Sequence, residues 1–168
     1  FRSLLKKLER RGVATTQVTV EITERVLVDQ LSNRSLQTLR ELQRRGIRIS
    51  LDDFGTGFAS LTHLQRLPVN EIKIDRTFVH DLTSDGSNSA IVKSMIGLAL
   101  NMDIDVVAEG VETAEQARLL RQWGCRYAEG NHFHRPIPAA AFARLCGFGA
   151  EAQTMLPGQL RHSDIRIS

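Results

Sequence analysis

The chain has 168 residues, of which 42% are hydrophobic and 24% charged, and its formal net charge is +3. This composition is typical of a folded globular domain rather than a disordered chain, and the mild charge without dense Lys or Arg runs leads us to expect no DNA partner. No stretch approaches the roughly 20 apolar residues of a membrane span, and Cys125 and Cys146 form no CxxC pair, so we expect a cytoplasmic protein without a membrane span.

Short apolar strands alternate with amphipathic helices along the whole chain, as judged from apolar periodicity and from glycines at helix ends. The predicted elements are a helix at 3–11, a strand at 16–21, a helix at 32–45, a strand at 47–52, a short helix near 58–66, a strand at 70–75, a helix at 87–100, a strand at 104–109, a helix from the capping box of Thr113 and Gln116 to Gly124, a short strand near 126–129 and a helix from Pro138 to about Cys146. We therefore predict one domain over residues 1–147 and a polar C-terminal tail over 148–168.

Each predicted strand has one apolar face and one unusually polar face. In strand 47–52, for example, Ile49 and Leu51 oppose Ser50 and Asp52. The alternation of strands and helices predicts a parallel sheet with right-handed crossovers. A doubly wound sheet would need two apolar faces, whereas a TIM-like (βα)₈ barrel has helices outside only and tolerates a polar inner face near its mouth. We therefore expect a (βα)₈ barrel.

The number of strands is too small for that barrel. We find about five strands, whereas a (βα)₈ barrel needs eight and about 250 residues. Either the barrel is incomplete, with its N-terminal strands missing, or another chain or segment completes it. The chain begins at Phe1 directly in an amphipathic segment, which we interpret as a position inside a larger protein.

Acidic residues lie at or near the C-terminal ends of the predicted strands. They are Glu21, Asp52, Asp53, Glu109 and Glu129. Active sites of parallel barrels form at this rim. Several carboxylates at one rim repel one another unless a cation lies between them, and Mg²⁺ and Mn²⁺ prefer carboxylate oxygens. Any one of these acids, taken alone, is equally well explained as an ordinary loop residue or helix cap.

Two adjacent aspartates, Asp52 and Asp53, can hold two metal ions, with one aspartate bridging the two ions. Two metals can activate a water and stabilise the leaving oxygen of a phosphodiester. Lys73 lies on the inward face of its strand, where it could orient that water or contact the phosphate. The pattern therefore indicates a two-metal site for Mg²⁺ or Mn²⁺.

Other motifs in the chain are weaker. Asp53-Phe54-Gly55 is the metal-binding tripeptide of protein kinases, but no glycine-rich loop or His-Arg-Asp loop accompanies it. Gly55-Thr56-Gly57 lacks the lysine of a P-loop and is better interpreted as a flexible turn beside the metals. His132 and His134 form an HxH pair without a third ligand, which is weak evidence for zinc.

Four apolar or sulfur-containing residues are interpreted as packing groups. We expect Phe78, Trp123 and Phe142 to lie in the core, and Cys125 to be a small buried hydrophobe rather than a nucleophile.

The chain resembles the EAL domain family. The motifs that carry the resemblance, between about residue 3 and about residue 145, are Glu21-Ile22-Thr23-Glu24, Asp52-Asp53-Phe54-Gly55-Thr56-Gly57-Phe58, Leu67-Pro68-Val69-Asn70-Glu71-Ile72-Lys73-Ile74-Asp75, Ala108-Glu109-Gly110-Val111-Glu112-Thr113 and Gly124-Cys125. The resemblance implies a modified (βα)₈ barrel that hydrolyses one phosphodiester bond of cyclic di-GMP, a bacterial second messenger, to linear pGpG with Mg²⁺ or Mn²⁺, and that Ca²⁺ inhibits.

The resemblance also implies roles for individual residues. Glu21, Asp52 and Asp53 match metal ligands, with Asp52 as the bridge; Lys73 matches the lysine that contacts the catalytic water; Glu109 matches a general base or metal-site partner; Glu112 matches a supporting acid; and Glu24 matches the glutamate that steadies the loop after Asp53. Members of the family often form homodimers and often follow a sensory or diguanylate cyclase domain, so we expect both here.

Three departures from the family pattern leave alternatives open. The Glu-Ala-Leu motif and the strand with a metal-binding asparagine are absent from this chain. Glu129-Gly130-Asn131 stands where the family usually has Gln-Gly-Tyr, which adds a negative charge near the metals and phosphate. The alternatives to an active phosphodiesterase are therefore a non-catalytic module that binds cyclic di-GMP or a protein, and an inactive fragment.

Overall fold

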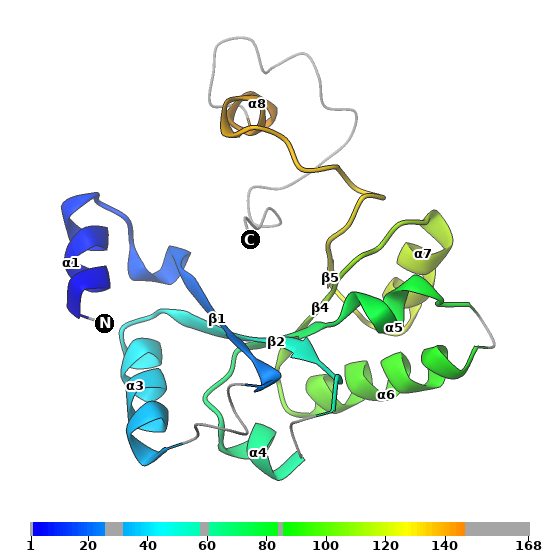
Figure 1. The fold of residues 1–168 in the computed structure, drawn as a ribbon, viewed down its shortest axis with the longest axis horizontal. Coiled ribbons are helices and arrows are strands. Elements are labelled where there is room, and N and C mark those ends of the chain that lie inside the picture. The colour runs from blue at the N-terminus through cyan, green and yellow to red at the C-terminus, as the bar shows by residue number, and fades with distance from the viewer. Residues whose placement is uncertain (1, 26–31, 58–60, 84–85, 147–168) are drawn as a thin grey trace.

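Five parallel strands form one sheet in the computed structural model (Figure 1), which describes residues 2–25, 32–57, 61–83 and 86–146. The strands are β1 (Thr19–Thr23), β2 (Arg48–Phe54), β3 (Glu71–Ile74), β4 (Asp105–Ala108) and β5 (Tyr127–Ala128). Each strand pairs in parallel with the next one along the chain, in the order β1-β2-β3-β4-β5. This order is that of part of a (βα)₈ barrel wall, and it confirms the predicted fold class.

Helices connect the strands. They are α1 (Arg2–Arg10), the 3-10 helix η1 (Thr15–Gln17), α3 (Asn33–Arg44), α4 (Leu61–Arg66), α5 (Arg76–His80), α6 (Ser87–Asn101), α7 (Ala114–Gln122) and α8 (Ala139–Leu145). The predicted capping box of α7 is present: the Thr113 side chain accepts from the Gln116 backbone, and the Gln116 side chain accepts from the Thr113 backbone. Part of the predicted helix near 58–66, and the predicted tail at 148–168, lie outside the described residues.

Three elements differ from the sequence prediction. Strand β2 runs to Phe54 rather than to residue 52, so Asp52 and Asp53 lie inside it rather than at its end. The first strand begins at Thr19 rather than at residue 16, because Thr15–Gln17 form a 3-10 turn, so Glu21 lies inside β1 rather than at its end. The short helix α5 was not predicted. It begins because the Asp75 carboxylate accepts from the backbone N–H of Thr77 at 2.8 Å, which ends β3 and caps a new helix.

The hydrophobic core lies between the outer face of the sheet and the helices that cover it. The side chains of Ile49, Leu51, Ile72, Ile74 and Ala108 are fully buried. Helix α3 packs on β2, and α6 packs on β3 and β4; in Figure 1 these helices lie along one side of the strands. The apolar outer face that the alternating sequence predicts is therefore the face that the helices cover.

The residues interpreted as packing groups have different environments. Phe78 and Trp123 are partly buried against the core. Cys125 is buried, and this burial raises the pKa of its thiol to about 11, which agrees with a structural rather than nucleophilic cysteine. Phe142 is half-buried and is not part of this core, because α8 stands away from the sheet (Figure 1).

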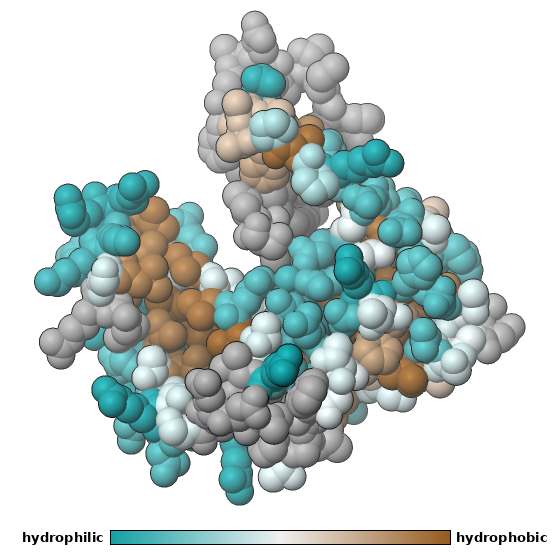
Figure 2. Space-filling view, viewed as in Figure 1, coloured by the Kyte–Doolittle hydropathy of each residue, from teal (hydrophilic) through white to brown (hydrophobic). Residues whose placement is uncertain are grey.

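The sheet has two open edges, β1 and β5. Figure 2 shows a hydrophobic area beside α1 and β1 that the described chain leaves uncovered. Val18, Val20 and Ile22 of this region are only partly buried. No helix in the described ranges is long and apolar enough to cross a membrane.

We expect residues 1–168, expressed alone, to associate or to melt over a broad temperature range. Uncovered apolar surface and unpaired strand edges favour contacts with other copies over a single packed state. Light scattering after size-exclusion chromatography and differential scanning calorimetry will measure both properties. A sharp two-state melt of a monomer would contradict this expectation.

Candidate active site

The centre of the site is the ammonium group of Lys73 on β3. Its Nζ lies 2.5 Å from Glu109 Oε1, 3.0 Å from Glu129 Oε1, 3.3 Å from Glu21 Oε1 and 3.9 Å from Asp52 Oδ1. The Lys73 side chain is only 7% exposed. The structure thus brings together four of the predicted acidic residues around one buried cation, and we call these five residues the Lys73 cluster.

Strand alternation explains why these side chains meet. In the parallel register Glu21 pairs with Ser50 and Thr23 with Asp52, so the Glu21 and Asp52 side chains point to the same, inner face. Lys73 pairs with Val107, two residues before Glu109. These inner side chains share the face opposite the core.

Glu129 enters the cluster from the edge of the sheet. Its backbone N–H donates to Ala108 O at 2.9 Å, which continues the pairing of β5 with β4 beyond the strand itself. The Glu129 side chain thereby reaches Lys73 next to that of Glu109. The predicted position of Glu129 at the rim is therefore the position that the structure shows.

A second polar layer lies below the cluster on the inner face. Arg48 Nη2 lies 2.5 Å from Asp105 Oδ2, and the Ser50 hydroxyl donates to Glu71 Oε1 at 2.9 Å. The Ser50 contact joins β2 to its neighbour β3, and the Arg48 contact reaches across β3 to β4. The inner face therefore also carries polar contacts below the Lys73 cluster.

Burial and neighbouring charges shift the pKa values of the two closest partners. Burial raises the pKa of Glu109 to about 7; Lys73 lowers it, while the hydrogen bond with Glu129 and the charge of Asp52 raise it. Burial alone would lower the pKa of Lys73, but its hydrogen bonds to Glu109 and Glu129 outweigh burial and raise it. Lys73 therefore stays protonated, and Glu109 is poised to exchange a proton near neutral pH.

Asp53 lies beside the cluster near the end of β2, where the pairing of β2 with β3 is irregular. Its φ is 56°, in the left-handed region, and its backbone N–H donates to Asp52 Oδ1 at 3.0 Å. Burial raises the pKa of the Asp53 carboxyl, and the charges of Asp52 and Asp75 raise it further. Asp75 was not predicted as a site residue, although the Asp-x-Thr pattern of a helix cap marks it in the sequence.

Glu24 stabilises the turn that follows Asp53 through two hydrogen bonds. Its side chain is 1% exposed, and its Oε2 accepts from the backbone N–H groups of Gly55 at 2.9 Å and Thr56 at 3.1 Å. Gly55 and Gly57 have positive φ values of 103° and 115°, which side chains rarely adopt. A Cβ on Gly55 would lie 2.3 Å from Met95 Cε, so the turn also packs closely on α6.

None of the contacts of the Lys73 cluster involves Glu112, His132 or His134. Glu112 is exposed, and its carboxylate forms no ion pair or hydrogen bond with the described residues. His132 and His134 are exposed as well; the His132 ring packs edge-on against Phe133, and His134 Nδ1 lies 2.6 Å from Arg135 O. The structure gives this histidine pair no further ligand among the described residues.

The donor set of the Lys73 cluster fits a hard divalent cation, although its present arrangement does not enclose one. All the convergent donors are carboxylate oxygens, which are the ligands that Mg²⁺ and Mn²⁺ prefer. Over the described ranges no three His, Cys, Asp or Glu side chains are placed to hold one metal ion. The ammonium of Lys73 occupies the middle of the cluster and is the counter-charge of the acids.

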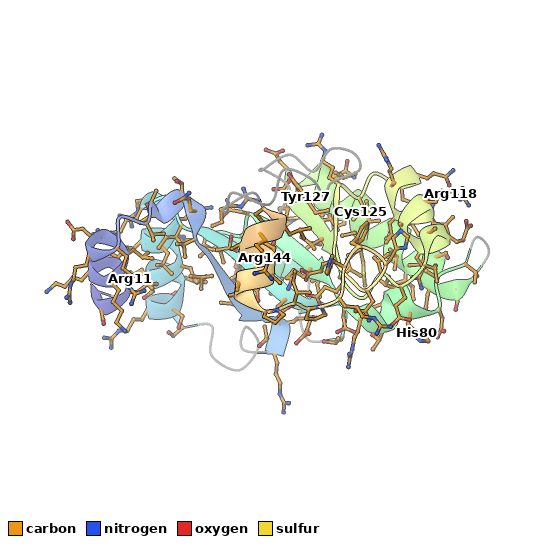
Figure 3. All side chains as sticks on the ribbon, turned by 90° about the horizontal axis from the view of Figure 1, so that it is seen from above. Arg11, His80, Arg118, Cys125, Tyr127 and Arg144 are labelled. Atoms are coloured by element: carbon orange, nitrogen blue, oxygen red, sulfur yellow. The ribbon has the colours of Figure 1, made fainter. Side chains whose placement is uncertain are left out.

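Charged residues on the helices are separate from this site. Arg11, directly after α1, and Arg118, on α7, lie toward opposite ends of the molecule (Figure 3). Arg118 pairs with Glu115 within α7. Such exposed pairs contribute little to stability.

Comparison with known proteins identifies relatives that match most of this chain. A family model described as "EAL domain" matches residues 1–136. The bifunctional diguanylate cyclase/cyclic di-GMP phosphodiesterase MucR of Pseudomonas aeruginosa is 39% identical over 137 residues, which are 82% of this chain and 20% of that protein. This chain thus spans about a fifth of that curated relative.

Two solved structures extend the comparison to the fold. The EAL domain of Mycobacterium smegmatis DcpA matches with a TM-score of 0.81 and 36% identity, over 88% of this chain and 66% of that one. A manganese and cyclic di-GMP complex of Klebsiella pneumoniae BlrP1 matches with a TM-score of 0.73 and 34% identity, over 79% of this chain and 34% of that one.

Proposed function

Since the chain belongs to the EAL domain family, we propose that the complete domain hydrolyses one phosphodiester bond of cyclic di-GMP and releases linear pGpG. The observation that supports this most directly is the buried Lys73 ammonium, which lies within 3.3 Å of three carboxylates. Glu109 and Glu129 directly follow the parallel strands β4 and β5, and Glu21 lies inside β1. The C-terminal end of the strands is the end of the sheet at which parallel barrels carry their chemistry.

We propose that Glu21, Asp52, Asp53 and Glu109 hold Mg²⁺ or Mn²⁺ in a two-metal site. When bound, two such ions supply an activated water and neutralise charge on the phosphate. The all-carboxylate donor set supports this assignment, as does the manganese complex of BlrP1. A metal among these residues would take over part of the neutralising role that Lys73 has in the described cluster.

The chain's own residues have separable roles in this proposal. Lys73, held protonated, donates hydrogen bonds to the attacking water or to a phosphate oxygen. Glu109, whose Oε1 lies 2.5 Å from Lys73 Nζ, accepts the proton that the water gives up, or holds a metal ion in its place. Glu24 has a supporting role, because it fixes the turn that follows Asp53.

The second candidate function is a module that binds cyclic di-GMP without hydrolysing it. The observation that favours it is Glu129, which places an additional carboxylate 3.0 Å from Lys73 where the family usually has an amide. This carboxylate occupies the ammonium that, in the phosphodiesterase, would donate to the attacking water. A binding module needs the pocket but not a competent metal pair.

We expect Glu129→Gln to lower the KM for cyclic di-GMP roughly tenfold, because it removes a negative charge beside Lys73. The same change removes a neighbour that raises the pKa of Glu109 above its ordinary value. If Glu109 acts as a base, the acid limb of the pH profile of kcat/KM should therefore move to lower pH.

Steady-state kinetics between pH 5 and 9 will measure both effects of Glu129→Gln, and Glu115→Gln on the exposed face of α7 is the matched control. An unchanged KM together with an unmoved acid limb would show that Glu129 does not act on the site. Binding of cyclic di-GMP without turnover in both proteins would favour the binding module.

The assay that separates the two candidate functions uses the complete gene product with cyclic di-GMP and Mn²⁺. We expect chromatography to show loss of cyclic di-GMP and equimolar formation of pGpG. Calorimetry in Ca²⁺, which the family resemblance implies is inhibitory, would report binding under the same conditions. Folded protein that binds the nucleotide but forms no pGpG would rule out the phosphodiesterase.

The partners of the domain follow from the same family membership. We propose a sensory or diguanylate cyclase domain in the same protein, as MucR combines cyclase and phosphodiesterase activities by its name. We also propose a cytoplasmic location, because Cys125 and Cys146 are free thiols.

We propose a homodimer through the outward face of α6. Ile91 is 42% exposed on this largely apolar helix. It lines a groove of about 520 Å³ together with Met95 and Leu98 of the same helix face. Exposed apolar side chains that gather in this way favour a contact with another protein surface.

Ile91→Arg should convert the dimer of the complete protein to a monomer, because a charge in an apolar contact is costly to desolvate. Sedimentation velocity at micromolar concentration will measure the mass. Thr38→Arg, on the exposed part of α3, is the control and should leave the dimer intact. A monomeric wild-type protein would contradict the proposed interface.

A further inference from the structure

Gln116 is a buried side chain that uses all of its hydrogen-bonding groups. It is 5% exposed. Its Oε1 accepts from the backbone N–H groups of Glu112 at 2.8 Å and Thr113 at 2.9 Å. Its Nε2 donates to the backbone carbonyls of Val79 at 3.0 Å and His80 at 2.8 Å. Only the first half of this arrangement belongs to the capping box of α7.

The second half of the arrangement joins two structural units. Val79 and His80 end α5, the helix that follows the strand of Lys73. Glu112 and Thr113 end the loop that follows Glu109, and this loop we define as residues 109–113. The side-chain amide of Gln116 therefore connects α5, which follows the strand of Lys73, to the 109–113 loop by hydrogen bonds.

Close backbone packing on both sides makes the 109–113 loop sensitive to this tie. A Cβ on Gly110 would lie 2.6 Å from Arg76 Cβ of α5. On the other side, a Cβ on Gly130 would lie 2.3 Å from Val111 N, and that N–H donates to Glu129 O at 3.0 Å. The loop thus lies between α5 and the segment of Glu129 with little room to shift.

We infer that Gln116 is a positioning residue that sets the register of the 109–113 loop against α5 and thereby keeps the Glu109 carboxylate in place for the divalent cation. The inference rests on the proposed function for the identity of that cation. Groups that orient the ligands of a metal commonly change its affinity, or the activity, by about 10- to 100-fold when they are replaced.

Gln116→Glu tests the tie to α5 by itself. A carboxylate still accepts from Glu112 and Thr113, so the cap of α7 remains. It cannot donate, and it places a negative charge against the carbonyls of Val79 and His80, so α5 and the loop are pushed apart. Ser32→Ala is the control, because Ser32 caps α3 by accepting from Ser35 N at 3.1 Å, outside the Lys73 cluster.

The experiment compares the complete gene product with its Gln116→Glu and Ser32→Ala variants. Calorimetric titration with Mn²⁺ gives the metal affinity, steady-state kinetics give kcat and KM, and thermal melting gives Tm. We expect Gln116→Glu to weaken Mn²⁺ binding and lower kcat by roughly tenfold or more, with a smaller change in KM. Ser32→Ala should lower Tm alone.

A Gln116→Glu variant that loses only Tm, with wild-type Mn²⁺ affinity and kcat, would overturn the inference. If the wild-type protein binds Mn²⁺ but shows no turnover, the proposed function fails, and the ratio of Mn²⁺ affinities still decides the role of Gln116. If Gln116→Glu does not fold, hydrogen exchange of the wild-type amides is measured instead. If the hydrogen bonds of Gln116 strengthen Mn²⁺ binding, Mn²⁺ binding must in turn stabilise those hydrogen bonds, so exchange at Glu112 and Thr113 should become slower. Unchanged exchange would overturn the inference.

Discussion

Lys73→Met is expected to lower kcat for cyclic di-GMP hydrolysis by at least about 10³-fold and, at the same time, to tighten Mn²⁺ binding. Removing one preorganised donor to a developing charge commonly costs about 10²- to 10³-fold, and Lys73 also carries the only positive charge of its cluster. The ammonium and a metal ion compete for the same carboxylates, since Nζ lies 2.5 Å from Glu109 and 3.0 Å from Glu129.

The opposite signs of these two effects make the Lys73 experiment specific. Simple misfolding would lower both activity and metal affinity. Lys93→Met, an exposed lysine on α6, is the control and should change neither. In metal-free buffer, Lys73→Met should also unfold more easily, because the carboxylates around it lose their counter-charge. Unchanged Mn²⁺ affinity together with wild-type kcat would show that Lys73 has no role in the site.

Asp52→Asn is expected to abolish hydrolysis, with a loss of at least about 10³-fold, and to weaken Mn²⁺ binding. The family resemblance assigns the bridging position to Asp52, and a neutral amide oxygen is a poor substitute for a carboxylate that two metals share. Calorimetric Mn²⁺ titration and the pGpG assay will measure both quantities.

Stability should change little in Asp52→Asn. The substitution removes one negative charge from a crowded group of acids, and Asp52 also contributes to the raised pKa of Glu109. The matched control is Asp81→Asn, whose side chain is exposed at the end of α5. If Asp52→Asn retained turnover, the metal assignment in this chain would be wrong.

The substitutions Lys73→Met and Asp52→Asn are thus expected to change the Mn²⁺ affinity of the site in opposite directions. Replacing the cation at the centre should favour Mn²⁺, and replacing a carboxylate should disfavour it. An electrostatic cluster with no metal function would show only the changes in stability. The comparison needs no structure of the metal-bound protein.

Period-two alternation explains why the sequence predicts most of the fold and the central part of the site. Ile49 and Leu51 must face helices if Ser50 and Asp52 face inwards, and parallel pairing then places Asp52, Lys73 and Glu109 together. The alternation of apolar and polar residues along each strand, together with the shared end of parallel strands, is sufficient to predict which side chains converge. The distances between these side chains do not follow from the sequence.

Tertiary contacts account for what the sequence does not predict. The five-residue helix α5 lacks apolar periodicity, and its end is held by Gln116, which is 36 residues away from His80 in the chain. Glu112 was expected beside the site, but its side chain is exposed and its backbone N–H donates to Gln116. Phe142 is a large apolar residue of the kind found in protein cores, yet it is only half-buried because α8 lies away from the sheet.

The measurement that tests the central claim most directly is the rate of cyclic di-GMP loss catalysed by the complete gene product after its metals have been removed by chelation. We predict no turnover in the stripped protein and a saturable return of pGpG formation as Mn²⁺ is added, with no return in Asp52→Asn. A folded wild-type protein that binds cyclic di-GMP yet forms no pGpG at any Mn²⁺ concentration would contradict the claim and identify a binding module.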